Sequence, residues 1–125
     1  RGNVLPEDVG VPVPQLPALL AAVAEIAERH ALEIPMVAHA GDGNTHPAIV
    51  YPAGDADAER RARLAFDDIM AAAIALGGTI TGEHGVGRLK AGSLEAQLGP
   101  DVMALNRRVK AALDPHGILN PGSFV

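Results

Sequence analysis

Residues 34–51 read IPMVAHAGDGNTHPAIVY, and this stretch decides the fold class. Two runs that contain apolar and β-branched residues flank the sequence GDGN at residues 41–44. The central Asp-Gly pair favours a two-residue hairpin loop, so the stretch predicts two antiparallel strands. In that register, His39 lies directly opposite His46.

Helical patterns flank the hairpin on both sides. Apolar residues recur at spacings of three and four over residues 16–31 and again over residues 55–76, which predicts two amphipathic helices. Residues 1–15 hold three prolines among valines, which indicates an edge strand or an extended segment. Residues 79–81 form a short β-like run before a glycine-rich loop.

The C-terminal third is expected to be helical and then rich in turns. A short polar helix is predicted over residues 91–98, and a last helix begins near Asp101 and stops at Asp114. The side chains expected to face inward from this last helix are apolar: Val102, Leu105, Val109 and Leu113. Because helices and strands are intermixed and the strand pair is antiparallel, the predicted fold class is α+β, in a single domain over residues 1–125.

Composition excludes several classes of protein. The chain has 125 residues, of which 48% are hydrophobic, a formal net charge of -5 and no cysteine. The acidic balance argues against a nucleic-acid partner, since neutralising phosphates needs a basic patch. Without cysteine, a metal site must use nitrogen and oxygen ligands. No apolar run is long enough to span a bilayer.

The hairpin carries the first candidate site. His39 and His46 would share one face of the strand pair, and two imidazoles at that separation can bind one metal ion. Asn44 has the same parity as His46, so its amide would lie on the same face. The alternative is that both histidines are ordinary hydrogen-bonded residues beside a turn.

The glycine-rich loop carries the second candidate site. Glu83 and His84 lie between Gly82 and Gly85. A carboxylate and an imidazole are the groups that would complete a catalytic metal site, as a third ligand and a proton acceptor. Such a pair also occurs in ordinary surface loops, and this alternative stays open.

Three motifs in order resemble a known family. They are HAGDGNTH at residues 39–46, GGTITGEHGVGRLK at residues 77–90 and DPHGILNPG at residues 114–122. Together they resemble the C-terminal cap domain of FAD-linked oxidases of the vanillyl-alcohol-oxidase type. Within that family the resemblance is closest to the FAD-linked subunit of glycolate oxidase and to D-lactate and D-2-hydroxyglutarate dehydrogenases.

The resemblance implies a ferredoxin-like antiparallel sheet with helices packed on it, as part of the cap domain. It also implies FAD-dependent oxidation of a D-2-hydroxy acid such as glycolate or D-lactate, assisted by a divalent metal, zinc or manganese. Carried over residue by residue, it assigns the roles as follows: metal ligands His39, His46 and Glu83, catalytic base His84, a substrate contact at Asn44 and a flavin contact at Asn120.

Further expectations follow from what the motifs leave out. The chain begins at Arg1 and nothing in it resembles an FAD-binding domain, so it is expected to be the C-terminal part of a longer polypeptide and inactive by itself. Thr45 stands where the family usually has a bulkier apolar residue, which would change the shape of the pocket. Expected partners are the FAD domain of the same polypeptide, an iron–sulfur electron-transfer subunit and a second copy of the protein. The expected location is the cytoplasm, or the inner face of the membrane as a peripheral protein.

Two other functions remain open from sequence alone. One is a stand-alone metal-binding or metallohydrolase domain that uses the same three ligands and a water molecule. The other is a structural cap that serves subunit association without catalysis of its own.

Overall fold

The structure is a computed structural model that describes residues 2–123. The chain divides into two compact units, Arg1–His84 (unit 1) and Gly85–Val125 (unit 2). The expectation of one domain over the whole chain stays a prediction. No helix among the described residues is long and apolar enough to cross a membrane.

Unit 1 contains every strand of the described chain and two of its long helices. In chain order the elements are β1 (Gly2–Pro6), β2 (Val9–Gly10), a 3-10 turn η1 (Val13–Gln15), α1 (Leu16–His30), β3 (Met36–His39), β4 (Asn44–Pro52) and α2 (Ala56–Ala75). The extended N-terminal segment and the two helices agree with the sequence prediction.

The sheet has a ferredoxin-like order. β4 is the central strand, with β1 and β2 along one side and β3 on the other, and every pairing is antiparallel. After α2 the chain returns beside β2, where a bridge joins Gly10 to Thr79. This is the split β-α-β arrangement, so the α+β class and the ferredoxin-like sheet are confirmed.

The hairpin register differs from the prediction. His39 pairs with Asn44 and Val37 pairs with His46, so the loop has four residues, 40–43, instead of two. A two-residue type I′ loop needs positive φ at both central residues, but Gly43 is the only residue of the loop that has it, at φ 85°. The carbonyl of His39 instead accepts hydrogen bonds from the N–H groups of Asp42 and Gly43. The predicted direct pairing of the two histidines is therefore wrong.

The shift in hairpin register does not change which face of the sheet each side chain occupies. The register has moved by two residues, and side chains alternate between faces with a period of two. His39, Asn44 and His46 therefore still share one face of the sheet, as predicted. On the opposite face, Thr45, Pro47 and Ile49 of β4 are fully buried.

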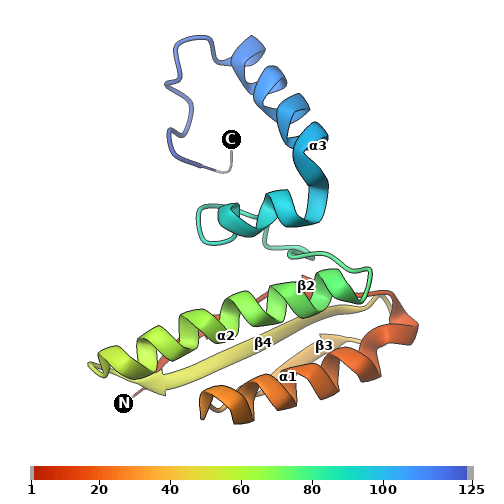
Figure 1. The fold of residues 1–125 in the computed structure, drawn as a ribbon, viewed down its shortest axis with the longest axis vertical. Helices are drawn as coiled ribbons and strands as arrows, with labels where there is room; N and C mark the ends of the chain where they lie inside the picture. The colour runs from red at the N-terminus through yellow and green to blue at the C-terminus, as the bar shows by residue number, and fades with distance from the viewer. Residues whose placement is uncertain (1, 124–125) are drawn as a thin grey trace. The chain divides into compact units, whose positions relative to one another are not determined.

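The core of unit 1 lies between this buried face of β4 and the helices. Figure 1 shows α1 and α2 side by side. The buried residues of α2 recur at helical spacing, which is why this long helix presents one continuous apolar face. These residues are Ala58, Ala62, Ala65, Phe66, Ile69, Met70 and Ala73.

Unit 2 holds one interrupted helix and a turn-rich tail. Helix α3 (Ala91–Leu113) is broken at Gly99, whose φ of 77° and ψ of 164° are not helical, and Pro100 follows. The break agrees with the two helices predicted from sequence. Their predicted burial is wrong: Val102, Leu105, Val109 and Leu113 are all exposed, while Leu94 and Met103 are buried. The described residues of unit 2 contain no further helix or strand that would cover this apolar stripe.

Candidate metal centre

The three predicted metal ligands lie together in unit 1. His39 ends β3, His46 lies in β4, and Glu83 lies in the loop that follows Thr81. The Oε1 atom of Glu83 is 3.1 Å from Nε2 of His46 and 3.6 Å from Nε2 of His39. Ligand atoms that surround a tetrahedral zinc ion lie about 3.4 Å apart, so the three side chains are spaced for one ion.

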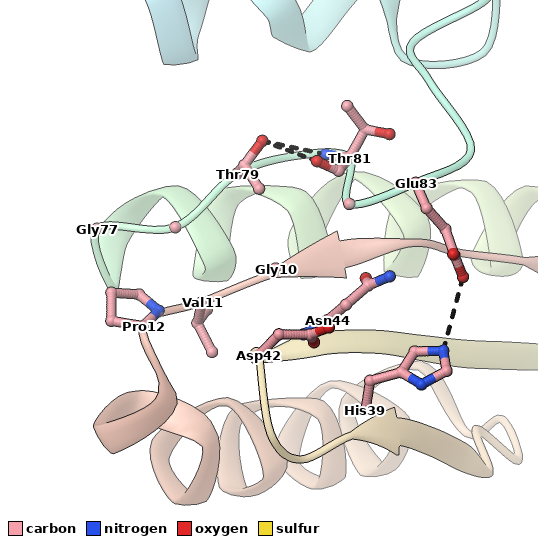
Figure 2. Close-up of a pocket in the computed structure, with 12 residues that line it drawn as sticks. Gly10, Val11, Pro12, His39, Asp42, Asn44, Gly77, Thr79, Thr81 and Glu83 are labelled. Carbon is pink, nitrogen blue, oxygen red and sulfur yellow. Dashed lines mark hydrogen bonds and ion pairs between the residues drawn. The ribbon is translucent and has the colours of Figure 1, made fainter.

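The histidine rings are arranged so that both can face one point. Their centroids are 5.3 Å apart and the rings meet edge to face. The side chains of His39 and Glu83 are 56% and 58% exposed, whereas His46 is only 21% exposed. Figure 2 shows the contact between His39 and Glu83 at the mouth of the pocket. An exposed three-ligand cluster leaves coordination positions open to a small molecule, as a catalytic metal site requires.

His84 follows directly after Glu83 and stacks on His46. The two ring centroids are 5.0 Å apart and the rings are inclined by 17°. His84 is exposed, so its imidazole can reach a molecule that occupies the site. The structure therefore places the predicted base beside the predicted ligands.

Sequence reasoning missed Asp8, which is the buried carboxylate beneath the site. Asp8 precedes β2 and is 1% exposed. Its Oδ2 atom accepts hydrogen bonds from the backbone N–H groups of Gly82, Glu83 and His84, and from the hydroxyl of Thr81. The available signal was a pair of acidic residues, Glu7 and Asp8, inside a valine-rich segment. No spacing rule connects that pair to a loop more than 70 residues later.

A second grouping of possible ligands overlaps the first. Ligand atoms of Asp8, His46 and His84 also lie within 4.8 Å of one another. Asp8 already uses its Oδ2 atom to accept hydrogen bonds from four donors of the loop, so this oxygen is not free for a cation. The first grouping is the better cation site, because its carboxylate is exposed and Oε1 lies close to both ring nitrogens.

Asn44 lines a pocket of about 640 Å³ beside the predicted ligands (Figure 2). The same pocket is lined by His39, Glu83 and the backbone around Gly10. The Oδ1 atom of Asn44 is buried and has no hydrogen-bond partner. A side chain at Gly82 would collide with this amide, since a Cβ there would lie 2.1 Å from Oδ1. The amide oxygen of Asn44 is therefore covered by the backbone of Gly82, and the close approach of the loop to β4 depends on glycine at this position.

Two other predicted features lie away from this cluster. Thr45 is fully buried on the opposite face of β4, and its hydroxyl donates to the carbonyl of Val9 at 2.9 Å. Its side chain therefore links β2 to β4, on the face opposite the pocket. Asn120 lies in the tail of unit 2, in a left-handed backbone conformation with φ 49°. Its contact with a flavin stays a prediction.

Known proteins with similar sequences carry the names of FAD-linked oxidoreductases. A glycolate oxidase subunit GlcD of Bacillus subtilis is 43% identical over 118 residues, 94% of this chain and 25% of that protein. The GlcD subunit of Escherichia coli K12 is 38% identical over 128 residues, 99% of this chain and 26% of that protein. A mitochondrial D-lactate dehydrogenase [cytochrome] of Arabidopsis thaliana is 36% identical over 118 residues, 94% of this chain and 21% of that protein.

The chain thus spans about a quarter of the length of these relatives. The family model described as "FAD linked oxidases, C-terminal domain" matches residues 1–124, which is nearly the whole chain. The described part of that range carries the three motifs, the ferredoxin-like sheet and the His39, His46 and Glu83 cluster. The chain therefore belongs to the family of C-terminal domains of FAD-linked oxidases.

Proposed function

We propose that this chain is the substrate- and metal-binding part of an FAD-dependent oxidoreductase that oxidises a D-2-hydroxy acid, such as glycolate or D-lactate. One observation carries the proposal: His39, His46 and Glu83 converge from three segments, with His84 stacked beside them. The names of the relatives, glycolate oxidase subunit and D-lactate dehydrogenase, support this substrate class.

The donor set fits a divalent metal. Two imidazole nitrogens and one carboxylate oxygen suit zinc or manganese, and three protein ligands leave room for the hydroxyl and carboxylate oxygens of a substrate. His39, His46 and Glu83 would hold this ion. When bound, such an ion lowers the pKa of a coordinated hydroxyl group and fixes its orientation.

His84 would move the proton. Its exposed imidazole accepts the proton of the substrate hydroxyl, while its backbone N–H is held by Asp8 at 2.9 Å. FAD, which an N-terminal domain of the same polypeptide would hold, would supply the acceptor for the hydride from C2. The product is then a 2-oxo acid.

Two asparagines would contact the substrate and the flavin. Asn44 lines the pocket, and its side-chain amide would orient the substrate through hydrogen bonds. Asn120 would contact the flavin. The proposed partners are an iron–sulfur electron-transfer subunit and a second copy of the protein. The proposed location is the cytoplasm, or the inner face of the membrane as a peripheral protein.

The test uses the intact polypeptide and follows bleaching of the flavin absorbance after anaerobic mixing with substrate. Glycolate or D-lactate should bleach the flavin, and L-lactate should not. His84→Ala should slow bleaching about 10²–10⁴-fold, because it removes the proton acceptor. His30→Gln is the matched control, since His30 lies at the end of α1 and bonds to Asp68.

Three outcomes would contradict the proposal. A polypeptide that contains no flavin would favour the stand-alone metal-binding or metallohydrolase domain. A flavin that no D-2-hydroxy acid bleaches would rule out the proposed substrate class. An unchanged rate in His84→Ala would favour a structural cap without its own catalysis.

A further inference from the structure

The carboxylate of Asp8 is surrounded by groups that belong to the candidate site. Three consecutive backbone N–H groups point at one atom, Oδ2, over distances of 2.8 Å from Gly82, 3.0 Å from Glu83 and 2.9 Å from His84. The hydroxyl of Thr81 donates to the same atom at 2.9 Å. A run of N–H groups that converges on an anion is a nest, and hydrogen bonds to a charged acceptor are stronger than neutral ones.

These bonds fix the part of the loop that carries the chemistry. The loop is rich in glycine and forms no regular structure, so nothing in its own sequence would hold one conformation. The backbone N–H groups of Glu83 and His84 are both bound to Asp8. The directions in which these two side chains leave the backbone therefore depend on one carboxylate that lies 75 residues earlier.

Asp8 also faces the inner nitrogen of His46. Its Oδ1 atom is 3.6 Å from Nδ1 of His46, and this ring nitrogen is buried without a hydrogen-bond partner. The other nitrogen, Nε2, lies 3.1 Å from Oε1 of Glu83. When Nε2 binds a metal ion, the imidazole proton must lie on Nδ1, where it points toward Asp8. This is the usual way in which a carboxylate orients a metal-binding histidine.

We propose that Asp8 is the positioning residue of the site: it sets the Nδ1–H tautomer of His46 and holds Glu83 and His84 in place. The inference rests on the proposed metal-binding function. Asp8 acts through these three residues and does not itself contact the metal or the substrate. Its buried position and its four loop donors favour this role over that of a direct ligand with His46 and His84.

The test compares Asp8→Asn with Asp114→Asn in the intact protein. Asp114 is a matched control in unit 2, because it is also buried and also accepts two backbone N–H groups, from Ile118 and Leu119. Zn²⁺ affinity is measured by competition with a coloured chelator. Asp8→Asn should weaken binding about 10–100-fold, as expected for loss of an outer-shell partner, and Asp114→Asn should leave it unchanged.

A second measurement needs no metal. It uses Glu83→Ala protein, because the carboxylate of Glu83 lies 3.1 Å from Nε2 of His46 and would compete for the imidazole proton in metal-free protein. NMR of ¹⁵N-labelled histidine reports which ring nitrogen of His46 carries the proton. Glu83→Ala should show the proton on Nδ1, and adding Asp8→Asn should move the population toward the Nε2–H tautomer.

The outcomes distinguish the positioning role of Asp8 from the proposed metal site. Wild-type Zn²⁺ affinity in Asp8→Asn, or an Nε2–H tautomer in Glu83→Ala, would overturn the role of Asp8. So would a Zn²⁺ ion bound by Asp8 itself. If the wild type binds no Zn²⁺ while His46 of Glu83→Ala shows the Nδ1–H tautomer, the proposed metal site fails and the orienting role of Asp8 is supported.

Discussion

Unit 1 and unit 2 differ in how they use their apolar residues. In unit 1, Ile49, Ile69 and Leu19 are fully buried between sheet and helices. In unit 2, Leu105, Leu113 and most of the other large apolar residues that the structure describes in that unit are exposed. The difference shows that helical periodicity alone does not create a core, because a stripe is buried only when a second element covers it.

Both units contain a buried aspartate that binds a loop, but the two loops carry different kinds of side chain. Each has a buried aspartate that accepts backbone N–H groups from a glycine-containing loop, Asp8 in unit 1 and Asp114 in unit 2. The loop held by Asp8 carries Glu83 and His84 beside the other candidate ligands. The loop held by Asp114 carries exposed apolar side chains, and Lys110 supplies a charged partner to the carboxylate at 2.8 Å.

The largest stability difference is expected between a core position of unit 1 and an exposed apolar position of unit 2. Ile49→Ala should lower the free energy of unfolding by about 2–5 kcal/mol, since it empties a fully buried site in β4. Leu105→Ala should change it by no more than about 0.5 kcal/mol, because Leu105 is 53% exposed. Urea denaturation of the 125-residue chain, followed by circular dichroism, measures both. Equal losses would mean that Leu105 is packed in solution.

A smaller effect is expected where glycine permits close packing. A Cβ at Gly82 would meet the amide of Asn44, whereas a Cβ at any described glycine of unit 2 would meet no atom within 4 Å. Gly82→Ala should therefore cost about 1–3 kcal/mol and displace Asn44. Gly92→Ala, in the first turn of α3, should stabilise the chain by up to about 1 kcal/mol.

Thermal or urea unfolding of the two glycine variants checks their signs. A neutral Gly82→Ala with unchanged NMR signals for Asn44 would contradict the close approach of the loop to β4.

The helix starts provide a third contrast. Asp55 caps α2 by accepting the N–H groups of Asp57 and Ala58, both at 3.0 Å, whereas Lys90 before α3 makes no side-chain cap. Asp55→Ala should lower the free energy of unfolding by about 1 kcal/mol. Asp55→Ser retains a capping oxygen and should restore most of it. An equal loss in both variants would assign the effect to the charge instead of the cap.

The smallest effect is a pH dependence confined to unit 2. The hydrogen bond from Lys110, followed by those from the backbone N–H groups of Leu119 and Ile118, lowers the pKa of Asp114. A lowered pKa in the folded state means that the carboxylate stabilises the turn above the ordinary aspartate value of about 4, and that this contribution is lost as the pH falls through the folded-state pKa.

The amide NMR shifts of Ile118 and Leu119 report this titration. Their midpoint should lie below the ordinary aspartate value, and Asp114→Asn should abolish it. A midpoint at or above the ordinary value would contradict the hydrogen bonding described for this turn.

Local patterns predicted most of the elements. The periodicity over residues 16–31 and 55–76 identifies α1 and α2, and the Gly-Pro pair at residues 99–100 marks the break in α3. The register of the hairpin could not be predicted, because an Asp-Gly pair also fits a four-residue loop in which only Gly43 has positive φ. The prediction that His39 and His46 share one face of the sheet is still correct, because the register moved by an even number of residues.

The candidate site was only partly predictable. Its histidines and Glu83 stand in short motifs, so sequence alone could name them. Asp8 could not be found in this way, since its contacts with the loop exist only after the sheet has brought β2 beside residues 79–84. Likewise, the exposure of Val102 and Leu113 depends on which elements lie beside α3, and periodicity carries no information about that.

Anomalous diffraction from crystals of the intact protein grown with Zn²⁺ would locate a metal ion at the proposed site. We expect a peak about 2.0–2.2 Å from Nε2 of His39, Nε2 of His46 and one carboxylate oxygen of Glu83, with no protein ligand at the remaining positions. Crystals of Glu83→Gln should show a weaker peak or none. A peak coordinated by Asp8, His46 and His84, or no peak at either group of ligands, would contradict a metal site formed by His39, His46 and Glu83.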